Sequence, residues 1–318
     1  MKITVVGAGG NVGSAAALTV AQRDFANEVV LVDIERKEGE KTFYPSKGRA
    51  LDQWQTSSIH GFDTRVKGTV NFEDTADSDI CIITAGVPRK PGMSRDDLLS
   101  INANIVKTVT QSLVKYSPDT IIIVVSNPLD VMTYVAWKAS GLPAEKVMGM
   151  AGILDTARYR AFLADELDVS PKDIQALILG GHGDTMVPLP RYTTVTGIPV
   201  TQLIEKDKLD AIIERTKVGG GELVGLMGTS AWFAPGAAAA QMAEAIALDQ
   251  NRIFPCAAWL TGQYGINDLY VGVPVKLGKG GIKEIIEIEL NADEQSMLDS
   301  SCSAVRTVFE DLERIQNG

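Results

Sequence analysis

The sequence predicts an α/β fold in which a doubly wound parallel sheet is followed by a second, α+β domain that contains an antiparallel meander. Short apolar runs rich in β-branched residues predict strands that are buried on both faces. These runs fall at residues 2–6, 28–32, 80–84 and 121–126. Amphipathic helical patterns alternate with them, at residues 11–24, 47–60 and 97–116. The alternation of strand and helix indicates parallel β-α-β units, which build a sheet of the Rossmann type.

The second half has a different pattern, with helices first and strands afterwards. Its helical patterns fall at residues 155–167, 202–216, 221–227 and 237–249. Three strand-like runs follow, at residues 254–260, 269–275 and 282–290, with glycine-rich breaks that predict an antiparallel meander. We expect the border between the two domains near residues 146–152, so that the domains cover residues 1–149 and 150–318.

A last helix is predicted after the meander. It begins at Asn291, because Asn291 and Glu294 have the spacing of a capping box. Its predicted apolar face runs through Met297, Ala304, Val308, Leu312 and Ile315. The chain shows no internal repeat and no low-complexity linker.

The composition is that of a globular protein with a surplus of acid. The chain has 318 residues and a mass of 34.0 kDa, with 45% hydrophobic and 22% charged residues, which disfavours a disordered chain. It carries 30 Lys and Arg against 40 Asp and Glu, a formal charge of −10. Because phosphate neutralisation needs a basic surface, nucleic acid and anionic membranes are disfavoured as partners. A small anionic substrate stays compatible if cations gather locally.

The cysteines and the N-terminus predict a cytoplasmic location. Cys81, Cys256 and Cys302 are far apart and lack metal-site spacing, so we expect buried thiols in a reducing compartment and no metal. The chain enters a predicted strand at Lys2, which leaves no room for the apolar region of a signal peptide. Gly and Pro residues interrupt the uncharged stretch 223–243, which we expect to form core helices rather than a membrane span.

A glycine-rich turn after the first predicted strand indicates a dinucleotide site. Gly7, Gly10 and Gly13 precede an amphipathic helix, where glycines let the backbone approach a pyrophosphate at the helix N-terminus. Asp33, at the end of the second strand, can accept hydrogen bonds from ribose hydroxyls and would repel a 2′-phosphate. These features favour NAD over NADP, although the cations at residues 36–37 leave a phosphate-binding role open.

His182 is the candidate for proton transfer. It follows the apolar run 174–179 and is flanked by glycines, and its pKa near neutrality suits a group that takes and gives a proton. Asp155 is a candidate to orient the imidazole. Arg158, three residues later on the same helical face, is a candidate to bind a carboxylate. The alternatives are a surface or capping role for His182 and an ordinary ion pair on a solvated helix. His60, the only other histidine, is expected at a helix end.

A loop with three cations follows the predicted strand at residues 80–84. Residues 85–95 include Arg89 and Arg95 together with two Pro and two Gly. Ligands bind at the carboxyl edge of a parallel sheet, so this loop could close over one as a lid; a solvated basic turn is the alternative. Asn127 follows another strand at the same edge, where it could bond a substrate hydroxyl or orient a nicotinamide.

Taken together, these motifs resemble the lactate/malate dehydrogenase family, most closely its lactate-dehydrogenase-like malate dehydrogenase branch. The segments that carry the resemblance are 86–95, 125–130, 150–155 and 180–184, and the match covers essentially the whole chain in order. The resemblance implies NAD-dependent oxidation of (S)-malate to oxaloacetate, with His182 as proton acceptor paired with Asp155. It implies that Arg158 binds the C1 carboxylate and that Arg95 polarises the reacting carbonyl.

The resemblance also implies the remaining contacts. Asn127 contacts substrate, Arg89 binds the second carboxylate, and Asn102, Val125 and Asn127 contact the cofactor. A homotetramer is expected, with a homodimer as the alternative.

Arg89 decides the expected substrate. Lactate dehydrogenases resemble this chain but commonly have a neutral Gln at that position. Closing Arg89 over pyruvate would bury an unpaired guanidinium, which costs several kcal/mol. The alternatives are a lactate or other 2-hydroxyacid dehydrogenase, an NAD-dependent glycosidase, which would need a metal site, and a catalytically silent NAD-binding protein.

The chain departs from the family pattern at two places. The glycine turn has one residue more than usual, and the stretch 34–46 is longer than usual. The longer stretch could extend the adenosine pocket, contact a neighbouring subunit or be an inert surface loop.

Overall fold

A computed structural model describes residues 1–88 and 94–317. Arg89, the predicted ligand of a second carboxylate, lies outside the described residues. Arg95 and the rest of the predicted site lie within them.

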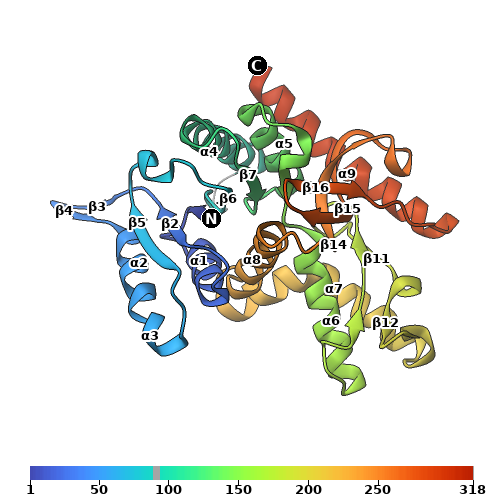
Figure 1. Ribbon diagram of the computed structural model, residues 1–318. Coiled ribbons are helices and arrows are strands. Elements are labelled where there is room, and N and C mark those ends of the chain that lie inside the picture. The colour runs from blue at the N-terminus through green and yellow to red at the C-terminus, as the bar shows by residue number, and fades with distance from the viewer. Residues whose placement is uncertain (89–93, 318) are drawn as a thin grey trace.

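Within the described ranges, the molecule is built on one nine-stranded sheet (Figure 1). Its strands are β1 (Lys2–Val6), β2 (Glu28–Val32), β5 (Arg65–Thr69), β6 (Ile80–Ile83), β7 (Ile121–Val124), β8 (Val147–Gly149), β14 (Arg252–Thr261), β15 (Asn267–Gly278) and β16 (Gly281–Ile285). Their spatial order is β16-β15-β14-β8-β7-β6-β1-β2-β5. The strands from β5 to β8 pair in parallel, whereas β14, β15 and β16 pair antiparallel. The predicted parallel sheet and antiparallel meander are both confirmed, and β14 joins the meander to β8 in the same sheet.

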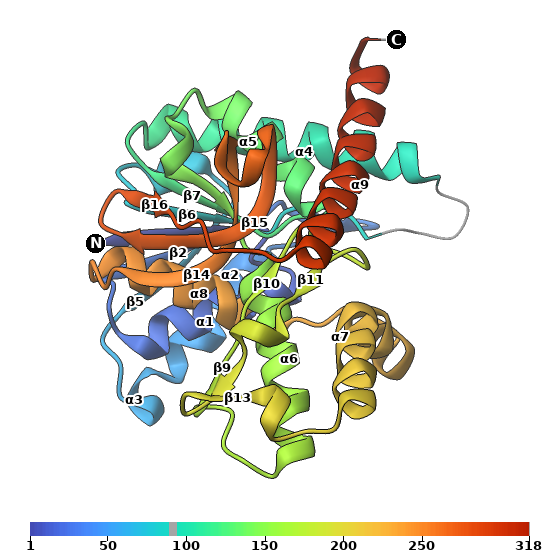
Figure 2. The same ribbon diagram turned by 90° about the vertical axis from the view of Figure 1, so that its right-hand side faces the viewer.

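Helices cover both faces of this sheet (Figure 2). One face packs against α1 (Asn11–Arg23) and α8 (Phe233–Ala247), and the other against α4 (Arg95–Tyr116), α5 (Leu129–Ser140) and the end of α9 (Ala292–Asn317). Alternate residues of a strand enter alternate cores: Ile82 packs with the first group and Ile83 with the second. The continuous apolar runs in the sequence follow from this double burial.

A third, smaller core lies below the sheet and forms the lower lobe in Figure 2. Its buried residues come largely from α6 (Gly152–Leu167), α7 (Lys206–Met227) and the short strands β9 (Ile174–Gln175), β10 (Ile178–Leu179) and β12 (Thr194–Val195). The strands β11 (Val187–Pro188) and β13 (Ile198–Pro199) pair with β10 and β12. Tyr159 and Leu163 of α6 are fully buried in this core. The lobe places the N-terminal end of α6 against the sheet.

The stretch 34–46 folds mainly as a hairpin. Strands β3 (Arg36–Glu38) and β4 (Lys41–Phe43) pair antiparallel, and all their residues are exposed. The hairpin projects from the edge of the molecule at the left of Figure 1. It leads into α2 (Pro45–Gln55) and α3 (Ser57–His60), so the predicted helix at residues 47–60 is two helices, and His60 ends the second as predicted.

Several predicted boundaries are wrong. The separate helices at 202–216 and 221–227 form the single helix α7, because the intervening residues continue the helix. The strand predicted at 282–290 ends at Ile285. On α9, Met297 is 41% exposed, and Leu298, Cys302 and Val305 are buried instead. Toward the C-terminal end of α9 the predicted face is confirmed, because Leu312 is buried and Val308 and Ile315 pack against the second core. Only in the first half of the helix is the buried face displaced by one residue.

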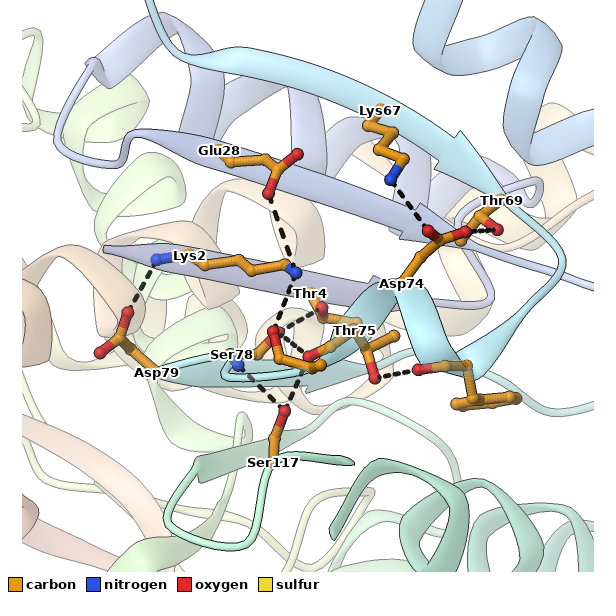
Figure 3. Close-up of polar contacts among 12 residues, drawn as sticks. Lys2, Thr4, Glu28, Lys67, Thr69, Asp74, Thr75, Ser78, Asp79 and Ser117 are labelled. Atoms are coloured by element: carbon orange, nitrogen blue, oxygen red, sulfur yellow. Dashed lines mark hydrogen bonds and ion pairs between the residues drawn. The ribbon is translucent and has the colours of Figure 1, made fainter. Parts of the chain in front are cut away.

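A network of polar contacts fills the space between the sheet and the segment before β6, away from the glycine turn (Figure 3). The hydroxyl of Ser78 bonds to Thr4 and to the carbonyl of Thr75, and the Ser117 hydroxyl accepts from the Ser78 N–H. These buried polar groups are therefore satisfied within the protein, which stabilises this end of the sheet without leaving a binding group free.

The predicted capping box at the start of α9 is confirmed. The Asn291 side chain accepts from the Glu294 N–H, and the Glu294 carboxylate accepts from the Asn291 N–H, both at 2.9 Å. Arg191 donates two further hydrogen bonds to the same carboxylate, at 2.9 and 2.8 Å. These Arg191 bonds, opposed by burial and assisted by the Asn291 N–H, lower the pKa of Glu294. The ionised form of Glu294 therefore stabilises the folded state.

We expect Glu294→Gln to lower the Tm at pH 7 by about 3 °C, since it removes the charge that Arg191 binds. Because the folded-state pKa of Glu294 is depressed, its contribution is complete above the ordinary glutamate pKa and is lost as the pH falls through the depressed value. The Tm values of wild type and Glu294→Gln should therefore become equal at acid pH. Asp293→Asn, at the exposed neighbouring position, is the matched control in thermal melts. A Tm difference that is as large at acid pH as at pH 7 would contradict a stabilising role of the ionised Glu294 carboxylate.

Candidate active site

The predicted cofactor residues lie at one edge of the parallel sheet. The glycine turn follows β1, Asp33 follows β2, and Asn127 comes shortly after β7. The carboxyl ends of parallel strands meet at this edge, which is where open α/β sheets bind ligands. The structure therefore brings together groups that are far apart in the sequence.

Asp155, Arg158 and His182 form one cluster. Asp155 and Arg158 lie in the first two turns of α6, and His182 lies on the loop after β10. Nδ1 of His182 is 2.8 Å from Oδ2 of Asp155, and Nη1 of Arg158 donates to Oδ1 at 3.3 Å. The Asp155 side chain is only 2% exposed, against 18% for His182 and 14% for Arg158. The cluster is thus a buried arrangement, and a solvated i,i+3 ion pair does not describe it.

The environment of His182 favours its protonated form. Burial of the imidazole acts against the charge, but the negative charge and hydrogen bond of Asp155, with a contribution from Asp130, outweigh it and raise the pKa of His182. Arg158 acts in the opposite direction. Because Nδ1 is engaged by Asp155, Nε2 is the nitrogen left to exchange a proton with a ligand.

Close packing explains the glycines before His182. Gly180 has a positive φ of 89°, and a Cβ on it would lie 2.6 Å from the Ser301 hydroxyl. A Cβ on Gly181 would lie 2.4 Å from the Val305 side chain. The His182 loop therefore runs directly against α9, and only glycine fits at these two positions.

The glycine turn also depends on close approach. A Cβ on Gly7, whose φ is +82°, would lie 2.8 Å from the backbone nitrogen of Ala85, and a Cβ on Gly13 would lie 2.6 Å from the Thr84 hydroxyl. Gly10 is the N-cap of α1 and, among the described residues, no side chain caps this helix and no acid lies in its first turn. Its N-terminal N–H groups are available to an anion, as a pyrophosphate site requires.

Asp33 points its carboxylate back at the glycine turn. Its Oδ2 accepts the Gly9 N–H and its Oδ1 accepts the Ile34 N–H, each at 2.8 Å. Sequence reasoning missed Gly9, although the run Gly7-Ala8-Gly9-Gly10 contains it. The held carboxylate and the uncapped helix start together fit an adenine dinucleotide.

Three other predicted site residues, Asn102, Val125 and Asn127, lie in different surroundings. Asn102 is buried: its Oδ1 accepts the Val87 N–H and its Nδ2 donates to the carbonyl of Asn127. It thus links the loop after β6 to the loop after β7. Val125 continues the parallel ladder past β7, donating its N–H to the Ile83 carbonyl, and the Asn127 side chain is exposed.

Arg95 begins α4 and is exposed. Within residues 1–88 and 94–317, no hydrogen bond or ion pair joins it to the cluster of Asp155, Arg158 and His182. The structure therefore does not bring Arg95 together with that cluster.

The cysteines are buried, as predicted. Burial raises the pKa of Cys81 and of Cys302 to about 12, so both thiols stay neutral. Across the described part of the chain, no group of three or more His, Cys, Asp or Glu side chains is arranged to hold a metal ion. No described helix is both long and apolar enough to span a membrane.

Comparison with known proteins gives consistent matches along the whole chain. Residues 1–149 match the family model of the lactate/malate dehydrogenase NAD-binding domain, and residues 153–315 match that of the α/β C-terminal domain. A malate dehydrogenase of Salinibacter ruber is 61% identical over 317 residues, covering 100% of this chain and 98% of its own. One of Cytophaga hutchinsonii is 62% identical over 314 residues, covering 98% of each.

The solved structure of a Salinibacter ruber malate dehydrogenase superposes with a TM-score of 0.93 at 58% identity, covering 100% of this chain and 99% of its own. The sequence and the fold thus agree on one family. The chain belongs to the lactate/malate dehydrogenase family.

Proposed function

We propose that this protein oxidises (S)-malate reversibly to oxaloacetate with NAD, using His182 as the proton acceptor. The observation that carries the proposal is the buried cluster of Asp155, Arg158 and His182 beside the sheet edge that holds the dinucleotide turn. The relatives named malate dehydrogenase support the substrate, and the alternative of lactate is not favoured.

His182 and Asp155 form the proton-transfer pair. Nδ1 of the imidazole is bound by the Asp155 carboxylate, so Nε2 takes the proton of the malate hydroxyl. The carboxylate then stabilises the imidazolium that forms. In the reverse direction the protonated imidazole donates to the carbonyl oxygen of oxaloacetate, and the raised pKa of His182 favours the protonated form that this step needs.

Three arginines bind and polarise the substrate in this proposal. Arg158 binds the C1 carboxylate; its Nη1 faces Asp155, and its buried Nε has no hydrogen-bond partner among the described residues. Arg95 stabilises negative charge on the reacting carbonyl oxygen, and Arg89 binds the second carboxylate. Asn127, exposed at the sheet edge, contacts the substrate.

The cofactor site uses the first domain. Bound NAD supplies the hydride acceptor at its nicotinamide. Gly7, Gly10 and Gly13 bring the backbone and the α1 N-terminus to the pyrophosphate. Asp33 binds the adenosine ribose. Further contacts come from Asn102, Val125 and Asn127.

We place the domain border at residues 149 and 150, which agrees with the ranges of the two family models. A cytoplasmic location is proposed from the buried free thiols. We propose a homotetramer, with a homodimer as the alternative. Large apolar side chains stand exposed on α2, α3, α7 and α8, and contact between copies would bury them. They include Leu51, Ile59, Leu226 and Phe233. Light scattering measures the state directly.

Replacing Asp33 tests the cofactor assignment. We expect Asp33→Ala to weaken NADH binding about tenfold, because the ribose loses a charged hydrogen-bond acceptor, and to reduce discrimination against NADPH. Fluorescence titration with both nucleotides measures this. Glu35→Ala, an exposed acid two residues away, is the matched control. Unchanged NADH affinity in Asp33→Ala would remove Asp33 from the site.

The substrate proposal is tested by NADH oxidation with oxaloacetate, with pyruvate and with no substrate. We expect wild-type kcat/KM to favour oxaloacetate about thousandfold, since an unpaired buried guanidinium over pyruvate costs about 4 kcal/mol. Arg89→Gln should lower kcat/KM for oxaloacetate and raise it for pyruvate. Lys90→Gln, the neighbouring cation, is the control. Equal kcat/KM values for the two substrates in wild type would contradict malate as the substrate.

A further inference from the structure

A second acid lies beside His182 and has no role in the function proposed above. Asp130 is the second residue of α5 and is 6% exposed. Its Oδ2 accepts the main-chain N–H of His182 at 3.0 Å. Its Oδ1 is buried and has no hydrogen-bond partner among the described residues. A carboxylate with one unsatisfied oxygen is costly to bury, so the group requires a physical reason.

Anchoring of the loop does not supply that reason. The main chain before His182 is already held by other elements: Gly180 exchanges two hydrogen bonds with Gly272 of β15, at 2.9 and 3.0 Å. Gly181 donates its N–H to the Ser301 hydroxyl of α9 at 2.9 Å. The neutral Ser301 hydroxyl thus accepts the Gly181 main-chain N–H, just as the Asp130 carboxylate accepts that of His182. What distinguishes Asp130 from Ser301 is its charge.

We propose that Asp130 is a second acidic positioning residue, whose buried carboxylate holds the His182 main chain and stabilises the protonated imidazole together with Asp155. The inference rests on the proposed role of His182 in proton transfer. It deepens that role, because two acids on two different helices then set the pH range in which His182 exchanges its proton.

Among residues 1–88 and 94–317, the charged and titratable groups around His182 are few. Asp155 and Arg158 face it from α6, and Asp130 from α5. From α9, Cys302 faces Asp130, but burial keeps that thiol neutral. Burial also raises the pKa of Asp130 to about 6, against the lowering effect of the His182 N–H and charge. Above this pKa Asp130 is ionised and adds its negative charge to that of Asp155.

Histidine NMR measures this effect without requiring activity. The chain has only two histidines, so a sample labelled with [13C]histidine gives two ring signals, and His60→Gln assigns them. His60 ends the surface helix α3 and serves as the internal reference. We expect Asp130→Asn, which keeps an acceptor oxygen but removes the charge, to lower the His182 titration midpoint by about one pH unit.

Ser301→Ala is the matched control. It removes the neighbouring main-chain hydrogen bond without changing any charge, so the His182 midpoint should stay at its wild-type value. If Asp130→Asn does not fold, Asp130→Ser offers a smaller neutral acceptor for the same comparison. An unshifted midpoint in the folded Asp130 variant, or an equal shift in Ser301→Ala, would overturn the proposal.

The pH profile of malate oxidation gives the second readout. Oxidation needs neutral His182, so the acid limb of kcat/KM should move to lower pH in Asp130→Asn by the same amount as the midpoint. For Ser301→Ala we expect a lower kcat, but the acid limb of its kcat/KM profile should lie at the same pH as in wild type. If wild type shows no activity with malate, the proposed function fails while the titration still tests Asp130. If wild type is active and the Asp130 variant shows no shift, only the Asp130 inference fails.

Discussion

The active site depends on one buried carboxylate, Asp155. Its two oxygens bind His182 and Arg158, so a single side chain sets the orientation of the proton-transfer group and of the cation beside it. Asp155 can do this because the start of α6 is wedged against the sheet: a Cβ on Gly152 would lie 2.8 Å from the Ile178 carbonyl and 2.9 Å from the Pro255 side chain. A carboxylate in that position is shielded from water, which strengthens its interaction with the imidazole.

One continuous sheet connects the two halves of the site. β14 pairs with β8, so the meander of the second half extends the parallel sheet of the first (Figure 1). The His182 loop is bonded to β15 through Gly180 and Gly272, and the glycine turn follows β1 in the same sheet. The distance between the proton-transfer pair and the dinucleotide turn is therefore set by a hydrogen-bonded framework rather than by a flexible linker. The helix α8, which packs on α1 from the second half of the chain, adds to this rigidity.

Strands and helices that depend on the local residue pattern can be predicted from the sequence. Contacts and buried faces that depend on packing between distant segments cannot. The strands at residues 2–6 and 28–32 match the prediction in full, because burial on both faces leaves a continuous apolar run. The pairing of Asp155 with His182 could be proposed from residue types, but only the fold separates it from a solvated ion pair. Asp130 ends the segment 125–130 that carries the resemblance, but its contact with His182 could not be predicted, because the two residues are 52 positions apart. Met297 was misplaced because the helical period alone does not say which face meets the sheet.

The net charge of −10 opposes the approach of a dianion, so the chemistry depends on local groups. The most direct test of the central claim, that His182 transfers the proton, is the rate of oxaloacetate reduction by His182→Asn, measured together with NADH affinity. The account predicts that kcat falls by about three orders of magnitude or more while NADH binds as in wild type, because the imidazole acts on the substrate and not on the nucleotide. Turnover close to wild type in a variant that binds NADH normally would contradict it.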